Sequence, residues 1–208
     1  MTEKKINKHE LRTKETRELL LKAAEKIFVR DGYEGAELGE VATLAGRTKG
    51  AIYAHFKSKE DIFLALIKQH TTRYRAQMEE MLAQSRSIDE NLAAFRRFCL
   101  TLADDQAWSL LFLEFKLFAI RHPEAKERLQ RYFEEVMPGD REKALTQILG
   151  PAGKGKDDLS RSVAARTLQP LLSALAVEAK FLPAVFDDHV VKKIAIRIFD
   201  ALLQSPPH

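Results

Sequence analysis

The sequence contains one cysteine, no long apolar segment and almost no strand pattern. Because Cys99 is the only cysteine among 208 residues, an intrachain disulfide is impossible and a metal site built on cysteines is disfavoured. No run approaches the roughly 20 apolar residues that a helix needs to cross a bilayer. The N-terminal stretch MTEKKINKHELR is polar and lacks the apolar segment of a signal peptide. We therefore expect a soluble cytoplasmic protein without a membrane partner.

The sequence also lacks a strong excess of either charge. Its 34 Lys and Arg residues stand against 30 Asp and Glu residues, and the formal net charge is +4. Most of this excess lies in the first 60 residues, where 13 basic residues oppose 10 acidic ones. A surplus of this size fits an ordinary solvated surface as well as a nucleic-acid site, so charge alone identifies no function.

Apolar residues recur at the three- and four-residue spacing of helices. Since 45% of the residues are apolar, the chain can bury a core. Near residue 58 the composition changes from three compact helices to longer, more apolar ones. We predict an all-α fold with two domains, at residues 1–57 and 58–208. The expected helices cover residues 14–30, 38–45, 48–55, 58–86, 90–103, 105–121, 124–137, 140–149, 158–180 and 188–203.

Motifs for catalysis and for metal binding are missing. The segment GPAGKGKD at residues 150–157 has the spacing of a phosphate-binding loop, but Asp157 replaces the required Ser or Thr and no strand precedes it. We interpret it as a loop between helices. The six histidines are scattered without ligand spacing, and Cys99 lies in an apolar stripe. We therefore expect no enzyme activity, no metal and no cofactor.

The segment from Leu38 to Phe56 has the plan of a helix-turn-helix. A short helix, a turn at Gly46 and a second short helix capped by Thr48 follow one another. In this plan the second helix enters the major groove of DNA, whose width of about 12 Å admits a helix with small exposed side chains. Gly50 meets that requirement at the start of the second helix, which makes this helix the expected DNA-reading element.

The expected DNA contacts follow from side-chain chemistry. Hydroxyl, imidazole and ammonium groups donate to phosphate oxygens, and such contacts give affinity without sequence choice. Residues at the start of the second helix are best placed for base edges, whereas Ile52 and Phe56 are spaced to face inward. The expected base-reading residues are Arg47, Thr48, Lys49 and Gly50, and the expected phosphate-binding residues are Tyr53, His55, Lys57 and Lys59.

The run GYEGAELGEVATLAGRTKGAIYAHFKSKEDIF, residues 32–63, resembles the DNA-binding domain of tetracycline-repressor-type (TetR) transcriptional regulators. The resemblance reaches from the first helix to the start of the fourth, and it implies DNA-contact roles for Thr48, Lys49, Gly50, Tyr53, His55 and Lys59. The matching residues are Gly32-Tyr33, Val41-Ala42, Ala45-Gly46, Lys49-Gly50, Ile52-Tyr53, His55-Phe56 and Ser58-Lys59-Glu60.

Four positions depart from the family's pattern. Ala36 and Glu37 stand where hydroxyl residues usually precede the second helix, which removes an N-cap and a phosphate contact. Gly39 replaces a residue that is often polar or basic. Arg47 replaces a small apolar residue of the turn, and it is either a new DNA contact or a solvated side chain.

The basic residues of the N-terminal arm also have two interpretations. Such residues either reach the minor groove or the phosphates, or belong to a flexible solvated tail. They are Lys4, Lys5, Lys8 and Arg12.

The resemblance further implies a homodimer in which the last two helices pair with their copies, and hence a near-palindromic operator. From the residues alone, the same apolar positions fit the core of a monomer equally well. These positions are Leu159, Val163, Leu168, Leu171, Leu172, Leu175 and Val177 in one helix, and Val190, Val191, Ile194, Ile198, Ala201 and Leu202 in the other.

Aromatic residues gather between residues 95 and 133, where they either form core or, as the resemblance implies, surround a small-molecule pocket. A small apolar or amphipathic effector would change the spacing of two DNA-reading heads, and the long helix from Ser58 would carry the motion. The selected effector-binding residues are Trp108, Phe112, Phe115 and Tyr132, with His70, Glu114 or Gln169 as polar partners.

Together these inferences predict a bacterial one-component transcriptional regulator. We expect a repressor that binds a palindromic operator as a homodimer, lies on the nucleoid when bound, and is released by a small molecule. The alternative is a helical protein–protein adaptor whose helix-turn-helix is structural. An enzyme would need a catalytic constellation that the sequence does not display.

Overall fold

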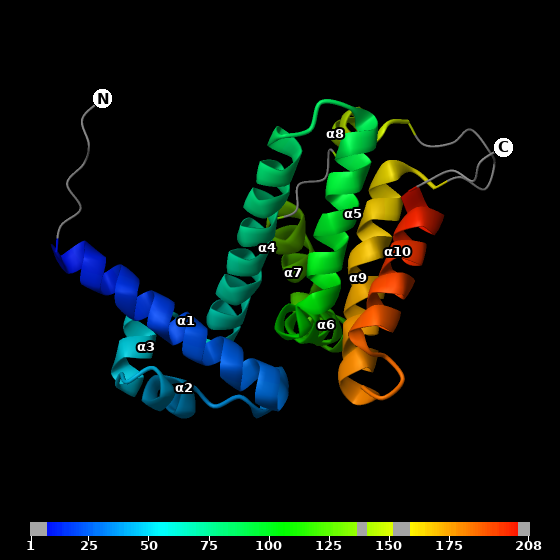
Figure 1. Ribbon diagram of the computed structural model, residues 1–208. Coiled ribbons are helices and arrows are strands. Elements are labelled where there is room, and N and C mark those ends of the chain that lie inside the picture. Colours follow the sequence, from blue (N-terminus) through cyan, green and yellow to red (C-terminus); the bar gives the residue numbers. More distant parts are fainter. Residues whose placement is uncertain (1–7, 137–140, 152–158, 204–208) are drawn as a thin grey trace, which may run out of the picture. The chain divides into compact units, whose positions relative to one another are not determined.

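The computed structural model describes residues 8–136, 141–151 and 159–203, and within these residues it contains helices and no β-strand (Figure 1). This confirms the predicted all-α class. The chain divides into two compact units, residues 1–69 and 70–208, and the division lies inside one helix. A functional boundary at residue 57 stays a prediction. No helix in the described part is long and apolar enough to cross a membrane.

The first unit packs three helices and the start of a fourth around an apolar core. Its core includes Ile27 and Phe28, which lie on the predicted stripe of the first helix and are buried. The rings of Phe28, Tyr33 and Phe63 meet at centroid distances of 5.1 to 6.0 Å and join the first helix to the fourth. The helices are α1 (Lys8–Gly35), α2 (Leu38–Leu44), α3 (Lys49–His55) and α4 (Lys59–Ala83), which continues into the second unit.

Helix α1 begins earlier than predicted. It starts at Lys8 and not at residue 14, so the interpretation of Lys8 and Arg12 as part of a flexible arm is wrong. Polar helix-forming residues extend it without an apolar stripe, which is why apolar spacing missed this part. Lys4 and Lys5 lie outside the described residues. The predicted break is confirmed at Gly32, whose φ of 72° and ψ of 177° are accessible mainly to glycine.

The described part of the second unit contains six further helices and the rest of α4. Helix α9 packs against α5, α6, α8 and α10, and Figure 1 shows α5, α9 and α10 side by side. Its inward residues Ala164, Leu168, Leu172 and Leu175 are buried. The six helices are α5 (Ile88–Asp104), α6 (Gln106–Arg121), α7 (Pro123–Val136), α8 (Arg141–Leu149), α9 (Arg161–Phe181) and α10 (Asp188–Leu203).

The start of α9 corrects the predicted helix over residues 158–180. The Oγ atom of Ser160 accepts a hydrogen bond from the backbone of Val163 at 3.3 Å, so the helix begins at Arg161. Leu159 precedes the helix and cannot belong to its apolar face. The helix runs on through Pro170 to Phe181. Most of the predicted loop GPAGKGKD, residues 152–157, lies outside the described residues.

Arg161 ties the start of α9 to two other segments. Its guanidinium group donates to the carbonyl oxygens of Gly150 at 3.0 Å, Pro151 at 2.8 Å and Leu203 at 2.5 Å. The side chain is buried, and these charge-assisted hydrogen bonds replace the water that it loses. Arg161 therefore holds the end of α8 and the end of α10 against α9.

Replacing Arg161 with Met should lower the free energy of unfolding by about 2–4 kcal/mol, because three carbonyl groups lose a charged donor. Urea unfolding followed by circular dichroism measures this change. Arg166→Met is the matched control, since Arg166 is exposed on the same helix, and its effect should stay within about 0.5 kcal/mol. Equal stability of the two variants would show that the Arg161 hydrogen bonds contribute nothing.

Candidate nucleic-acid interface and ligand cavities

The turn between α2 and α3 closes with two backbone hydrogen bonds. The N–H of Gly46 donates to Thr43 at 3.0 Å and the N–H of Arg47 donates to Ala42 at 2.9 Å, which is the Schellman arrangement. Gly46 has a φ of 63°, a left-handed conformation that costs other residues roughly 1–2 kcal/mol. Gly46 therefore sets the direction in which the chain leaves α2 and enters α3.

Helix α3 is capped at its start and anchored along one side. The Oγ1 atom of Thr48 accepts a hydrogen bond from Ala51 N at 3.3 Å, which confirms the predicted N-cap. Ile52 and Phe56 are buried, as their spacing predicts. The guanidinium of Arg17 lies 4.9 Å from the centroid of the Phe56 ring and covers it from α1.

The other side of α3 is open to solvent. Arg47, Thr48, Lys49 and Gly50 are exposed, and Tyr53 is 55% exposed. The nearest atom to a Cβ added at Gly50 would be Thr48 Oγ1 at 3.8 Å, so the fold itself does not require glycine there. The structure thus gathers the predicted base-reading residues on one short exposed segment.

The predicted phosphate-binding residues lie in less uniform surroundings. Lys57 is exposed, whereas His55 is half-buried. The backbone N–H of Asp61 donates to Ser58 Oγ at 3.1 Å, and the Asp61 carboxylate accepts from the N–H of Lys57 at 3.0 Å. Ser58 and Asp61 thus cap the start of α4, but the carboxylate binds the N–H of Lys57 and not that of Ser58, as it would in a capping box.

Lys59 connects α4 to the end of α1. Its ammonium donates to the carbonyl oxygens of Glu34 at 3.0 Å and Ala36 at 3.4 Å. The same ammonium lies 4.8 Å from the centroid of the Tyr33 ring. A cation at this place satisfies carbonyl groups that a helix end leaves without partners. Lys59 has a structural role within the first unit, and its contact with phosphate stays a prediction.

Helix α2 lacks a side-chain cap, which is the consequence expected from Ala36 and Glu37. Glu37 occupies the N-cap position and makes no capping hydrogen bond with its side chain. An ion pair connects α2 to α1 nearby, where Arg30 donates to Asp31 and to Glu40 at 2.7 Å each. These groups are exposed to solvent, so their ion pairs contribute little to stability.

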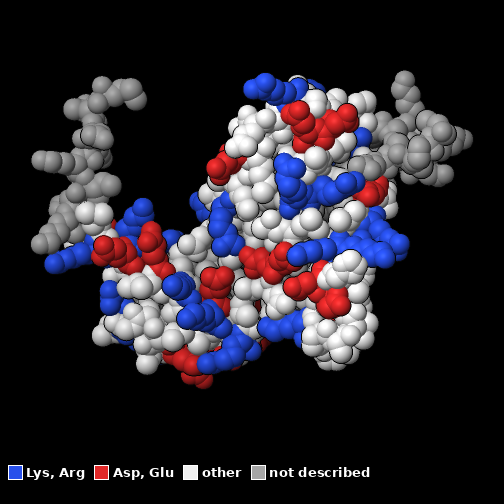
Figure 2. All heavy atoms as spheres, viewed as in Figure 1, with Lys and Arg blue, Asp and Glu red and all other residues white. Residues whose placement is uncertain are grey.

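Figure 2 shows basic and acidic side chains mixed over the visible face of the molecule, without one continuous field of either sign. This agrees with the small net charge of +4. Contacts between phosphate and a few lysines and arginines near α3 stay a prediction, and the small net charge favours such local contacts over a field of the whole protein.

One cavity of the second unit lies beside the only tryptophan of the chain. Its volume is about 100 Å³, and its walls combine apolar and polar side chains. Trp108 is 2% exposed, and among the described residues its indole Nε1 has no hydrogen-bond partner. We call this space the Trp108 cavity. Its lining residues are Thr71, Tyr74, Arg75, Met78, Phe98, Leu102, Trp108 and Gln169.

The other predicted effector residues are distributed differently. Phe115 lines a second pocket, which lies between α6, α7 and α9. Phe112 is buried and lines neither that pocket nor the Trp108 cavity. Tyr132 is half-buried and also lines neither. Of the predicted polar partners, Gln169 lines the Trp108 cavity and His70 stacks on Trp108 at a centroid distance of 5.0 Å. Effector contacts of Phe112 and Tyr132 stay predictions.

Asp105 organises the surroundings of Trp108, a role that apolar spacing could not reveal. One carboxylate oxygen accepts from the backbone N–H of Trp108 at 2.8 Å and caps α6. The other accepts from the Tyr74 hydroxyl and, at 2.9 Å, from Arg73. Burial, followed by the Asp105 carboxylate, raises the pKa of Tyr74 above its ordinary value, so the hydroxyl stays a neutral donor. This network joins α4 to the start of α6.

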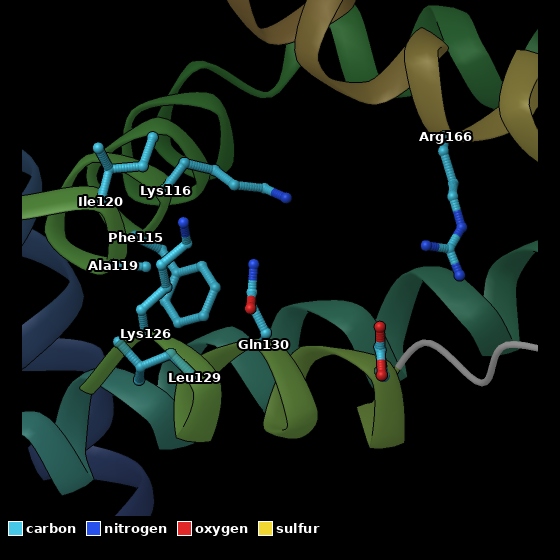
Figure 3. Close-up of a pocket in the computed structure, with 9 residues that line it drawn as sticks. Phe115, Lys116, Ala119, Ile120, Lys126, Leu129, Gln130 and Arg166 are labelled. Carbon is cyan, nitrogen blue, oxygen red and sulfur yellow. The ribbon is translucent and has the colours of Figure 1, made fainter. Parts of the chain in front are cut away.

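A second and larger pocket lies between α6, α7 and α9, with a volume of about 340 Å³ (Figure 3). Apolar side chains and three cations contribute to its walls. We call it the basic pocket. Its lining residues are Phe115, Lys116, Ala119, Ile120, Lys126, Leu129, Gln130, Glu134 and Arg166.

The described residues include no group of three or more His, Cys, Asp or Glu side chains that could hold a metal ion. Cys99 is buried, and this burial raises the pKa of its thiol to about 12. A thiol of this kind stays protonated near neutral pH and is a poor nucleophile. Among the described residues, Cys99 therefore does not provide a reactive thiol.

Comparison with known proteins agrees with this geometry. Residues 20–66 match the family described as bacterial regulatory proteins, tetR family. The HTH-type transcriptional repressor BepR of Brucella suis biovar 1 (strain 1330) is 44% identical over 75 residues, which make up 36% of this chain and 34% of BepR. The match thus spans about a third of that relative's length.

Similar solved structures cover nearly the whole chain. FadR from Bacillus halodurans, a fatty acid degradation regulator, has a TM-score of 0.68 at 18% identity. The aligned residues make up 93% of this chain and 97% of the FadR chain. FadR from Bacillus subtilis in complex with stearoyl-CoA has a TM-score of 0.65 at 18% identity and covers 91% and 99%. At this identity the likeness shows the fold, and it confirms an N-terminal helix-turn-helix domain followed by a larger helical part.

Two glycines of the interface should respond oppositely to alanine. Gly46→Ala should lower the free energy of unfolding by roughly 1–2 kcal/mol, because a left-handed residue gains a Cβ. Gly50→Ala should raise it by about 0.5–1 kcal/mol, because Gly50 is helical and has room for a Cβ. Urea unfolding measures both changes. Destabilisation by Gly50→Ala would contradict the open surroundings described for Gly50.

Proposed function

We propose that this chain, whose residues 20–66 match the tetR family of bacterial regulatory proteins, is a repressor of that family. It binds operator DNA as a homodimer and leaves it when a small molecule binds its second unit. The matching relatives are regulators and not enzymes, so its activity is binding. Its operator is a near-palindrome, because two identical subunits read two half-sites related by a two-fold axis.

The exposed side of α3 is the observation that carries DNA binding. Ile52 and Phe56 use one side of the helix for anchoring, so the opposite side is available for the major groove. Gly50 adds little bulk there and lets the backbone approach the base pairs. Lys49 and Arg47 stand beside it and can donate to the O6 and N7 acceptors of guanine.

Phosphate contacts add affinity around this reading segment. Tyr53 presents a hydroxyl group and Lys57 an ammonium, and both side chains are exposed. Thr48 adds a hydroxyl group at the N-terminus of α3. Each lysine–phosphate contact releases condensed counterions, so affinity should fall steeply as salt rises.

The dimer is proposed to form through α9 and α10, with fewer residues than the apolar spacing predicted. Leu168, Leu172, Leu175 and Val191 are buried within the subunit, so they belong to its own core. On the outer side of the two helices apolar residues remain accessible, which supports a partner surface. They are Val163, Leu171, Val177, Val190, Ile194, Ile198, Ala201 and Leu202.

The Trp108 cavity is the proposed effector site. Leaving a buried indole N–H unpaired costs roughly 1–3 kcal/mol, so a ligand with an acceptor atom gains by pairing with it. The cavity of about 100 Å³ is smaller than the roughly 300–1,000 Å³ of typical ligand sites, so an effector must widen it. The FadR complex with stearoyl-CoA supports a small-molecule ligand for a protein of this fold.

Helix α4 is the proposed connection between effector and DNA. It is one continuous helix from Lys59, in the first unit, to Ala83, in the second. A ligand beside Trp108 contacts α4 through Tyr74, which Asp105 links to the start of α6. We expect ligand binding to displace α4 and so change the spacing of the two α3 helices, which must match successive major grooves about 34 Å apart.

A matched pair of lysines tests DNA reading. On DNA from upstream of the protein's own gene, Lys49→Ala should weaken operator binding by about 1–3 kcal/mol and affect unrelated DNA less. Lys57→Ala should weaken both DNAs similarly and reduce the salt slope by about 1. Fluorescence anisotropy at several salt concentrations measures both effects, and Lys192→Ala on α10 is the control.

The proposal fails if Lys49→Ala weakens operator and unrelated DNA by the same factor. A helical adaptor whose helix-turn-helix is structural would show no sequence-dependent binding in any variant. Gly50→Ala separates folding from recognition, because it should stabilise the protein and yet weaken operator binding.

A further inference from the structure

The basic pocket between α6, α7 and α9 has the size and walls of a ligand site that is separate from the Trp108 cavity. Its volume of about 340 Å³ falls within the range of roughly 300–1,000 Å³ typical of small-molecule sites. Phe115 and Leu129 are buried at its base. Ile120, which is 66% exposed, adds an accessible apolar side chain to the wall of the same pocket.

Positive charge dominates the polar part of this pocket. Lys116 comes from α6, Lys126 from α7 and Arg166 from α9, whereas Glu134 is the one acidic side chain among the lining residues that the structure describes. Figure 3 shows Arg166 across the opening from Lys116, with Gln130 between them. Three elements thus direct cations toward one space that has an apolar base.

Lys116 and Arg166 repel each other across the pocket. Burial lowers the pKa of Lys116, and the charge of Arg166 lowers it further. Lys116 also lies over the Phe112 ring at 5.3 Å, which partly compensates for lost hydration. An anion placed between the two cations would remove their repulsion and stabilise the charged form of Lys116.

We propose that the basic pocket binds an amphipathic anion, with a carboxylate head between Lys116 and Arg166 and an aliphatic tail on Phe115, Ile120 and Leu129. A purely apolar ligand would gain nothing from the positive charges of the pocket, and a cationic ligand would be repelled. A nucleic-acid backbone would gain nothing from the apolar base. The site does not depend on the proposed DNA binding, because it lies wholly within the second unit.

Three probes with the same tail test this assignment on the full chain by isothermal titration calorimetry: decanoate, decanol and decylammonium. Decanoate should bind at least about tenfold more tightly than decanol, since a charge-assisted pair contributes that much. Decylammonium should not bind. Lys116→Met and Arg166→Met should each weaken decanoate by about tenfold and leave decanol unchanged.

Two further variants locate the site. Ile120→Ser should weaken decanoate and decanol alike, because it removes tail contacts. Trp108→Phe should leave decanoate binding unchanged, because Trp108 lines the other cavity. Lys180→Met, an exposed change near the end of α9, is the charge control, and thermal melts confirm that each variant is folded.

Equal affinities for decanoate and decanol would overturn the proposal, as would the absence of binding to either probe. Loss of decanoate binding in Trp108→Phe would place the ligand in the Trp108 cavity and overturn it as well. If Lys180→Met weakened decanoate binding as much as Lys116→Met does, the net charge of the protein and not the pocket would explain the binding. This result would also overturn the proposal. None of these outcomes bears on operator binding, so the proposed function is tested separately.

Discussion

The anchoring of α3 is the constraint on which the DNA-binding surface depends. Isolated helices shorter than about 12–15 residues are marginal in water, and α3 has 7 residues. Burial of Ile52 and Phe56 stabilises it from one side, while the left-handed turn at Gly46 sets its direction. Because only the side with Ile52 and Phe56 packs against the other helices, the opposite side of α3 can carry a glycine and cations. The surface proposed to read DNA is therefore a consequence of how α3 is anchored.

The second unit combines two cavities of different chemistry along the same helices. The Trp108 cavity offers the unpaired N–H of a buried indole among apolar and polar side chains, and the basic pocket offers three cations above an apolar base. Helices α6 and α9 contribute to both. Asp105 links the Trp108 cavity to α4 through the hydroxyl group of Tyr74.

Local features of the fold could be predicted from the sequence, and long-range ones could not. The turn at Gly46 and the cap at Thr48 involve residues a few positions apart, so spacing and residue type were sufficient. Lys59 instead bonds to Glu34, 25 positions away, and Arg161 bonds to Leu203, 42 positions away. Nothing in a sequence pattern identifies such distant carbonyl partners.

The two proposed ligand sites were only partly predictable for a related reason. Aromatic residues that line a cavity and those that fill a core have the same spacing and composition. In the structure, Trp108 and Phe115 line two different cavities, whereas Phe112 is buried and lines neither of them. The spacing of the aromatic residues does not distinguish these cases. The cations of the basic pocket come from three helices and become neighbours only in the folded chain.

Hydroxyl-radical footprinting on DNA upstream of the protein's own gene tests the central claim most directly. The account predicts two protected half-sites related by a dyad, with centres one helical turn of about 10 base pairs, or a multiple of it, apart. A variant with Ile194→Asp and Ile198→Asp on the outer side of α10 should lose this paired protection. A single unsymmetrical footprint, or a paired footprint that survives in the variant, would contradict the account.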